Sequence, residues 1–389
     1  WYTSYTPYQA EVSQGRLEAL LNFQTVICDL TGLPLANCSL LDEATAAAEA
    51  ATMFFGARSR AQVKAGANVL FVDEKVFAST LAVIHTRAIP QGMKIVTGDY
   101  KTFTFTPEVF GAIVQYPNAD GSIEDYREFI GRAQENGTKV AVAADLMSLV
   151  LLTPPGEWGA DVVFGSSQRF GIPMFYGGPS AAYFATKDEY KRAIPGRIIG
   201  ISKDAYGHPA YRLALQTREQ HIKREKATSN ICTAQALLAT MAGFYAVYHG
   251  AEGLKNIASR IHATAGFVAK ELEKLGYKQL NKDFFDTLKI ELPANVSIDA
   301  LREIALECKV NLRYFDSGLV GISIDETTQP TDVGVLMYIF SGAAGKDYML
   351  QEAIPCQTYF DPKFARTSSF LQQDVFKKYH TETELMRYI

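Results

Sequence analysis

Strand-like apolar runs alternate with segments of helical periodicity along the first half of the chain, and this alternation limits the possible folds more than any other feature. The runs are apolar at nearly every position, and they cover residues 69–72, 112–116, 140–143 and 161–164. A helical pattern lies between two of them at residues 123–136, with Gly137 at the expected C-cap position. Strands that are apolar on both faces and alternate with helices predict an α/β fold with a mainly parallel sheet covered on two sides.

The order of elements changes after a long helical segment at residues 231–249. A shorter mixture of helices and strands follows, with strand-like runs at 287–290, 311–314 and 320–323 and a helical pattern at 298–308. We therefore predict a large α/β domain at residues 1–250, a smaller α+β domain at 251–345 and a C-terminal extension at 346–389.

Composition and charge exclude several classes of protein. The 389 residues are 48% hydrophobic with a net charge of −4, and the lysines and arginines are scattered, so we expect neither a nucleic-acid nor a membrane partner. No apolar run approaches the roughly 20 residues that span a bilayer. The five cysteines are far apart and form no Cys-x-x-Cys pair, so we expect no metal site and a reducing compartment; they are Cys28, Cys38, Cys232, Cys308 and Cys356.

Two neighbouring strand ends carry part of a cofactor site. Enzymes that use an aldehyde cofactor pair an aspartate at a strand end with the ring nitrogen, and a later lysine forms the Schiff base. Here Asp145 follows one predicted strand, but the later position holds Gln168, or Arg169 if the register shifts by one. Neither side chain forms an imine, so the chain should not hold such a cofactor covalently. Asp145 alternatively caps a turn.

Several strings occur in an order that resembles the glycine cleavage P-protein family, and in particular its N-terminal half or separate N-type subunit. They are Tyr-Thr-Pro-Tyr-Gln at 5–9, Ser-Gln-Gly at 13–15, Ser-Leu-Leu-Asp-Glu-Ala-Thr at 39–45, Gly-Ser-Ser-Gln-Arg-Phe-Gly at 165–171, Thr-Arg-Glu-Gln-His-Ile at 217–222 and Lys-Ala-Thr-Ser-Asn at 226–230. The resemblance extends over essentially the whole chain. It also indicates that the chain is a piece of something longer.

The resemblance implies a pyridoxal-phosphate-dependent transferase fold (fold type I) with a seven-stranded sheet. The implied activity is that of an oxidoreductase of the glycine cleavage system, which decarboxylates glycine with pyridoxal phosphate and passes the aminomethyl group to the lipoyl group of H-protein. The implied partners are the catalytic C-terminal half, lipoylated H-protein and glycine. The implied compartment is the bacterial cytoplasm, or the mitochondrial matrix in a eukaryote.

Alignment with the cofactor-bearing half of the family places Gln168 opposite its Schiff-base lysine. The resemblance therefore implies that Asp145 belongs to a vestigial site, that this chain alone is inactive, and that the partner half binds pyridoxal phosphate covalently. The family's phosphate-binding loop corresponds to Asp42-Glu43, where two carboxylates would repel a phosphate. These residues either cap their own helix or reach across an interface to the partner's site.

Two further groups of residues are candidates for the partner's active site. Thr228, Ser229 and Asn230 either cap the following helix or contact the partner's cofactor in trans. A second group either lines a small polar substrate pocket or fills an interface, and it consists of Tyr5, Thr6, Tyr8 and Gln9. Lys226 is the nearest lysine to any of these strings, but it lies in a charged run rather than after a strand.

Two other functions remain open at this stage. One is a purely structural or regulatory partner of the catalytic half. The other is a binding module that takes a small anion near Asp145 and Arg169, at the carboxyl end of the predicted sheet, where open α/β folds bind ligands.

Overall fold

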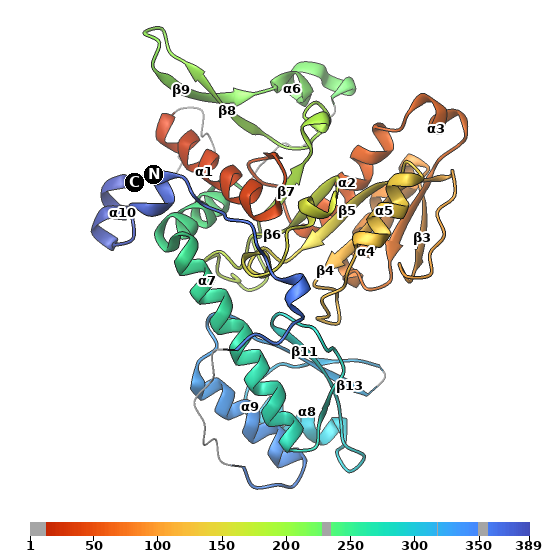
Figure 1. The fold of residues 1–389 in the computed structure, drawn as a ribbon, viewed down its shortest axis with the longest axis vertical. Coiled ribbons are helices and arrows are strands. Elements are labelled where there is room, and N and C mark those ends of the chain that lie inside the picture. Colours follow the sequence, from red (N-terminus) through yellow and green to blue (C-terminus); the bar gives the residue numbers. More distant parts are fainter. Residues whose placement is uncertain (1–12, 228–234, 317, 349–356) are drawn as a thin grey trace. The chain divides into compact units, whose positions relative to one another are not determined.

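The computed structural model describes residues 13–227, 235–316, 318–348 and 357–389. These residues form two compact units (Figure 1). The first unit comprises the chain up to Tyr116 together with Asp125–Leu254 and Arg366–Ile389, and the second comprises Pro117–Glu124 and Lys255–Ala365. Each unit is therefore built from separate stretches of sequence, and the three-part domain division given above remains a prediction.

A seven-stranded sheet forms the centre of the first unit, in the order β1-β7-β6-β5-β4-β2-β3. The strands are β1 (Leu35–Ala36), β2 (Val69–Asp73), β3 (Lys94–Gly98), β4 (Val109–Tyr116), β5 (Lys139–Ala144), β6 (Val162–Ser166) and β7 (Ala182–Thr186). Strands β3, β2, β4, β5 and β6 pair in parallel, whereas β7 and β1 are antiparallel to their neighbours. The predicted mainly parallel sheet is confirmed, and all four apolar runs lie in its strands.

Apolar side chains cover both faces of this sheet because successive strand residues point in opposite directions. Leu70 packs under the alanine-rich helix α2, in a buried cluster that includes Ala47 and Phe54. The next residue, Phe71, points to the other face and stacks on Phe103 with 3.9 Å between ring centroids. The helices of this part are α1 (Gln14–Thr31), α2 (Glu43–Gly56), α3 (Arg60–Lys64), α4 (Ala78–Ala88) and α5 (Arg127–Glu135).

The remaining elements of the first unit are a two-stranded sheet and three helices. They are β8 (Ile198–Lys203), β9 (Pro209–Ala214), α6 (Gln220–Lys223), the first part of α7 (Ala236–Lys274) and α10 (Glu382–Tyr388). Helix α7 breaks at Gly250, which has φ 60° and ψ −175°. A side chain there would meet the carbonyl of Phe376 at 2.7 Å, so the break requires glycine. His380 Nδ1 lies 2.7 Å from the Tyr248 carbonyl oxygen beside this break.

The second unit contains an antiparallel sheet in the order β10-β11-β13-β12, together with helices. Its elements are the rest of α7, β10 (Lys278–Gln279), β11 (Thr287–Glu291), α8 (Ile298–Glu307), β12 (Arg313–Tyr314), β13 (Leu319–Ser323) and α9 (Pro330–Ala343). His262 is buried, with Nδ1 2.7 Å from the Phe285 carbonyl and Nε2 accepting from the Tyr359 amide at 2.7 Å. Burial lowers the pKa of His262.

Short 3₁₀ turns connect many of these elements. They lie at Ile89–Gln91, Ser148–Val150, Pro155–Trp158, Asp188–Tyr190, Gln216–Arg218, Arg224–Lys226, Pro362–Phe364 and Asp374–Lys377. Among the residues that the structure describes, no helix combines the length and apolarity needed to cross a membrane.

The C-terminal segment is held on the first unit by the guanidinium of Arg366. This group donates to the carbonyl oxygens of Asp29 at 2.6 Å, Leu30 at 3.0 Å and Leu149 at 2.9 Å, and its Nε donates to Ser368 at 3.0 Å. Asp29 and Leu30 lie in the last turn of α1, where carbonyl groups have no partner within the helix. Arg366 therefore supplies the end of α1 with donors, and burial lowers its pKa to about 10.

Replacing Arg366 with methionine should destabilise the first unit. The substitution keeps much of the aliphatic stem but leaves buried carbonyl groups without donors, so we expect a loss of about 2–4 kcal/mol in the free energy of unfolding, measured by urea denaturation. The exposed Arg60 offers a matched control, since Arg60→Met should change that free energy by less than about 0.5 kcal/mol. Equal effects of the two substitutions would show that Arg366 does not hold this segment.

Candidate functional site

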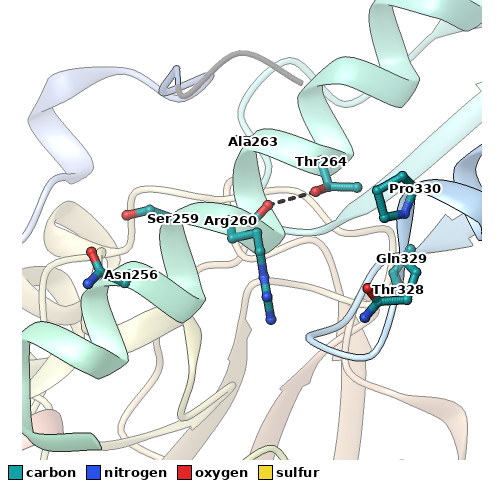
Figure 2. Close-up of a pocket in the computed structure, with 8 residues that line it drawn as sticks. All are labelled: Asn256, Ser259, Arg260, Ala263, Thr264, Thr328, Gln329 and Pro330. Atoms are coloured by element: carbon teal, nitrogen blue, oxygen red, sulfur yellow. Dashed lines mark hydrogen bonds between the residues drawn. The ribbon is translucent and has the colours of Figure 1, made fainter. Parts of the chain in front are cut away.

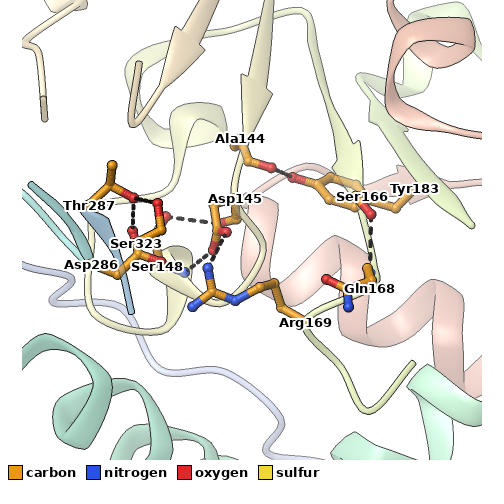
Figure 3. A network of polar contacts seen from close by, with 10 residues as sticks. All are labelled: Ala144, Asp145, Ser148, Ser166, Gln168, Arg169, Tyr183, Asp286, Thr287 and Ser323. Carbon is orange, nitrogen blue, oxygen red and sulfur yellow. Dashed lines mark hydrogen bonds and ion pairs between the residues drawn. The ribbon is translucent and has the colours of Figure 1, made fainter. Parts of the chain in front are cut away.

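Asp145 lies directly after β5, at the carboxyl end of the parallel strands, and its backbone and carboxylate are both engaged. Its amide donates to the Tyr116 carbonyl of β4 at 3.0 Å. Its Oδ1 accepts from the Ser148 amide at 2.7 Å, and its Oδ2 pairs with Arg169 Nη1 at 3.1 Å (Figure 3). The bond to Ser148 is that of a turn cap, which was the structural alternative for Asp145. Both carboxylate oxygens are thus used within the chain.

Gln168 lies in the turn that follows β6. Its amide donates to Ser166 Oγ at 3.2 Å, and its side-chain Nε2 donates to the Ile172 carbonyl at 3.0 Å. Gly171 has φ 73° in this turn, and a side chain there would meet the ring of Tyr245 at 2.7 Å. The side-chain amide of Gln168 is thus bonded to the backbone of the turn that contains it. The next residue, Arg169, pairs with Asp145.

Tyr183 of β7 joins this region, although nothing in the sequence distinguished it from other buried strand residues. Its hydroxyl donates to the Ala144 carbonyl at 2.7 Å. Gly165 permits this approach, because a side chain there would clash with the same carbonyl and lie 2.9 Å from the tyrosine ring. Burial and the carboxylates of Glu43 and Asp145 raise the pKa of Tyr183, so the hydroxyl remains a proton donor.

The start of α2 brings a second carboxyl group to the site. Asp42 caps the helix, accepting from the Thr45 amide at 2.7 Å, so the predicted self-capping is confirmed for this residue. Glu43 instead accepts a hydrogen bond from the backbone of Ser166. Its Oε1 is buried and has no hydrogen-bond partner among the described residues. Burial, followed by the nearby charge of Asp145, raises the pKa of Glu43 to about 7.

We call the group formed by Glu43, Asp145, Ser166, Arg169 and Tyr183 the Asp145 cluster. It contains two carboxyl groups and one guanidinium, and no lysine. Pyridoxal phosphate needs an amine for its aldehyde, an unpaired carboxylate for its ring nitrogen and donors for its phosphate. The cluster has no amine, its strand-end carboxylate Asp145 is already bonded to Ser148 and Arg169, and its two carboxyl groups disfavour a phosphate, so its residues do not fit that cofactor. The surplus of carboxyl groups also argues against the small-anion interpretation.

The other predicted site residues are not brought to this cluster by the described part of the chain. Thr228, Ser229 and Asn230, and the N-terminal group Tyr5, Thr6, Tyr8 and Gln9, lie outside the described residues, so their roles stay predictions. Lys226 is exposed at the end of a short 3₁₀ turn. No group of three histidine, cysteine, aspartate or glutamate residues within the described ranges could hold a metal ion.

Each unit also has a cavity that the sequence did not indicate. The cavity of the first unit has a volume of about 360 Å³ and lies beside the break in α7, where His249, Lys377 and His380 line it. The cavity of the second unit has a volume of about 460 Å³ and lies between α7 and the start of α9 (Figure 2). Arg260 lines it, and its Nη2 donates to the Glu326 carbonyl at 3.0 Å.

Comparisons with known proteins agree on one family. Residues 1–340 match the family model "Glycine cleavage system P-protein". The whole chain is 66% identical to a glycine dehydrogenase (decarboxylating) of Bacteroides thetaiotaomicron, and it spans 41% of the length of that relative.

Two solved structures support the fold. The crystal structure of a glycine decarboxylase (P-protein) in inhibitor-bound form has a TM-score of 0.78 and 32% identity, over 88% of this chain and 79% of that one. An alanine–glyoxylate aminotransferase from Nostoc sp. has a TM-score of 0.56 and 14% identity, over 84% and 86% of the two chains. The predicted fold type I of pyridoxal-phosphate-dependent enzymes is confirmed.

Glu43→Gln should change the pH dependence of thermal stability. The raised pKa of Glu43 means that, between its ordinary value and about 7, the folded chain keeps a proton that the unfolded chain has released. Wild-type stability should therefore fall relative to the variant as pH rises from about 5 to about 8.5, since glutamine does not ionise. Differential scanning calorimetry at the two pH values should find the larger advantage of the variant at the higher one.

Glu49 provides the control for this prediction, because it lies on the same helix and pairs with Arg87 at 2.6 Å. Glu49→Gln removes an ion pair and should give no such advantage at the higher pH. A Glu43→Gln curve parallel to that of the wild type would contradict the assignment.

Proposed function

Since the chain belongs to the glycine cleavage system P-protein family, we propose that it is the half of a glycine dehydrogenase (decarboxylating) that carries no Schiff-base lysine. The chain corresponds to the N-terminal part of its relatives, and it spans 41% of the length of the relative from Bacteroides thetaiotaomicron. Together with the catalytic C-terminal half, it would release the glycine carboxylate as carbon dioxide. The aminomethyl group would pass to the lipoyl group of H-protein.

One observation carries this proposal: the strand end where the fold type I lysine belongs has Gln168, and its amide bonds to Ile172. An amide has no nucleophilic nitrogen for an imine, so this chain alone is expected to be inactive. Pyridoxal phosphate would then be bound covalently by the partner half. The proposed compartment is the bacterial cytoplasm, or the mitochondrial matrix if the source is eukaryotic.

The proposed contribution of this half is to support and complete the partner's site. Thr228, Ser229 and Asn230 would add hydroxyl and amide groups to the partner's cofactor, and the N-terminal group Tyr5, Thr6, Tyr8 and Gln9 would line the glycine pocket. Part of the surface would dock lipoylated H-protein. Within this half, Asp145 would serve the packing of the vestigial site rather than the chemistry.

A purely structural or regulatory role is the second candidate, and the closed bonding of Asp145 with Ser148 and Arg169 favours it. The two roles differ in their dependence on the trans contacts. If the role is structural, substitution of Tyr5, Thr6 or Ser229 should leave turnover intact once assembly with the catalytic half has been verified.

Glycine-dependent release of carbon dioxide should appear only when this chain is mixed with the catalytic half and H-protein. We expect the purified chain to be inactive alone, and Gln168→Ala to keep the activity of the mixture within about twofold of the wild type, because the amide takes no part in the chemistry. The exposed Lys226 provides a control, and Lys226→Ala should behave in the same way. Carbon dioxide release by the chain alone would contradict the proposal.

A further inference from the structure

We propose that Arg169 and Glu43 exclude pyridoxal phosphate from the Asp145 cluster by occupying the places of its charged groups, so that the missing lysine is only one of three barriers. The inference rests on the proposed function in one respect, since the family resemblance aligns this cluster with a cofactor site. Its test does not depend on glycine turnover.

The first barrier is at the carboxylate that would pair with the cofactor ring. Arg169 Nη1 lies 3.1 Å from Asp145 Oδ2, while the Ser148 amide holds Oδ1 at 2.7 Å. About four fifths of the Arg169 side chain is buried, its exposed fraction being 20%. A protonated pyridine nitrogen would have to compete with this guanidinium for Asp145 Oδ2, and breaking a partly buried ion pair is unfavourable. The chain thus provides its own counterion for Asp145.

The second barrier is at the start of α2, which the family resemblance aligns with the phosphate-binding loop. A helix N-terminus binds phosphate through free backbone amides, but Asp42 has already taken the Thr45 amide at 2.7 Å. Glu43 takes the backbone hydrogen bond of Ser166, and its carboxyl group is buried. A phosphate dianion would therefore face two carboxyl groups, with repulsion that is strong at low dielectric.

These contacts have a consequence for engineering the chain. Gln168→Lys restores the amine, but it leaves both the Asp145–Arg169 pair and Glu43 unchanged. Lysine at position 168 should consequently gain little cofactor. Replacing Arg169 with alanine and Glu43 with glutamine in the same background should open the site, because Asp145 is then available to the ring nitrogen and residue 43 can no longer ionise.

The experiment compares three forms of the 389-residue chain: Gln168→Lys alone, Gln168→Lys with Arg169→Ala and Glu43→Gln, and a matched control. The control combines Gln168→Lys with Arg87→Ala and Glu49→Gln, which removes an arginine–glutamate pair of 2.6 Å between α4 and α2. Each form is incubated with pyridoxal phosphate and reduced with borohydride. Peptide mass mapping then measures the pyridoxyl group at residue 168, and circular dichroism and melting curves verify folding.

We expect the Arg169/Glu43 triple variant to carry roughly tenfold more pyridoxyl at residue 168 than Gln168→Lys or the control. A roughly tenfold change in binding is the order of effect that one close charge has. Equal labelling of all three forms would overturn the inference and leave the lysine as the only missing element. Absence of label from a folded triple variant would also overturn it.

Two double variants keep the test decisive if the triple variant does not fold. Gln168→Lys with either Arg169→Ala or Glu43→Gln should label to an intermediate degree, and no gain in either folded double variant would contradict the proposal. Failure of this inference leaves the activity of the mixed halves unaffected, so it is distinguishable from failure of the proposed function.

Discussion

The parallel register of β4, β5 and β6 is the constraint on which the rest of the first unit depends. Both faces of the sheet are buried, and because these strands run parallel their carboxyl ends meet at one edge, where the polar groups of the Asp145 cluster gather. The Asp145 amide joins that edge to Tyr116, and the Tyr183 hydroxyl joins it to Ala144. If the pairing register of β5 or β6 shifted by one residue, Asp145 or Ser166 would lie on the opposite face of the sheet, and the Asp145 cluster would not form.

The electrostatics of the cluster are those of a closed structural site. Asp145 is satisfied by Arg169 and Ser148, and the start of α2 is satisfied by Asp42. Glu43 is the exception, because burial beside Asp145 makes its charged form costly. Perturbed carboxyl groups often mark functional sites. Here the perturbation accompanies a fold type I scaffold, and the neighbouring Asp145 is already bonded within the chain.

Much of this architecture could be predicted from local patterns. The four apolar runs became β2, β4, β5 and β6, since a strand buried on both faces leaves a signal in its own residues. The sequence predicts a helix that ends at residue 249. The structure has a break at Gly250, but α7 continues beyond it to Lys274. Periodicity did not reveal this continuation, because a single glycine with positive φ interrupts the dihedral angles without ending the hydrophobic pattern.

The sequence by itself determined the fold class and the family, because each depends on residue identity and order along the chain, and it is the source of the proposal that Gln168 takes the place of a Schiff-base lysine. Only the tertiary structure decided that Arg169 pairs with Asp145, that Glu43 turns inward to Ser166, and that Arg366 holds the C-terminal segment to the end of α1. These contacts join residues 24, 123 and 337 positions apart. No local propensity encodes such pairs, since they depend on which strand ends and helix ends the packed sheet brings together.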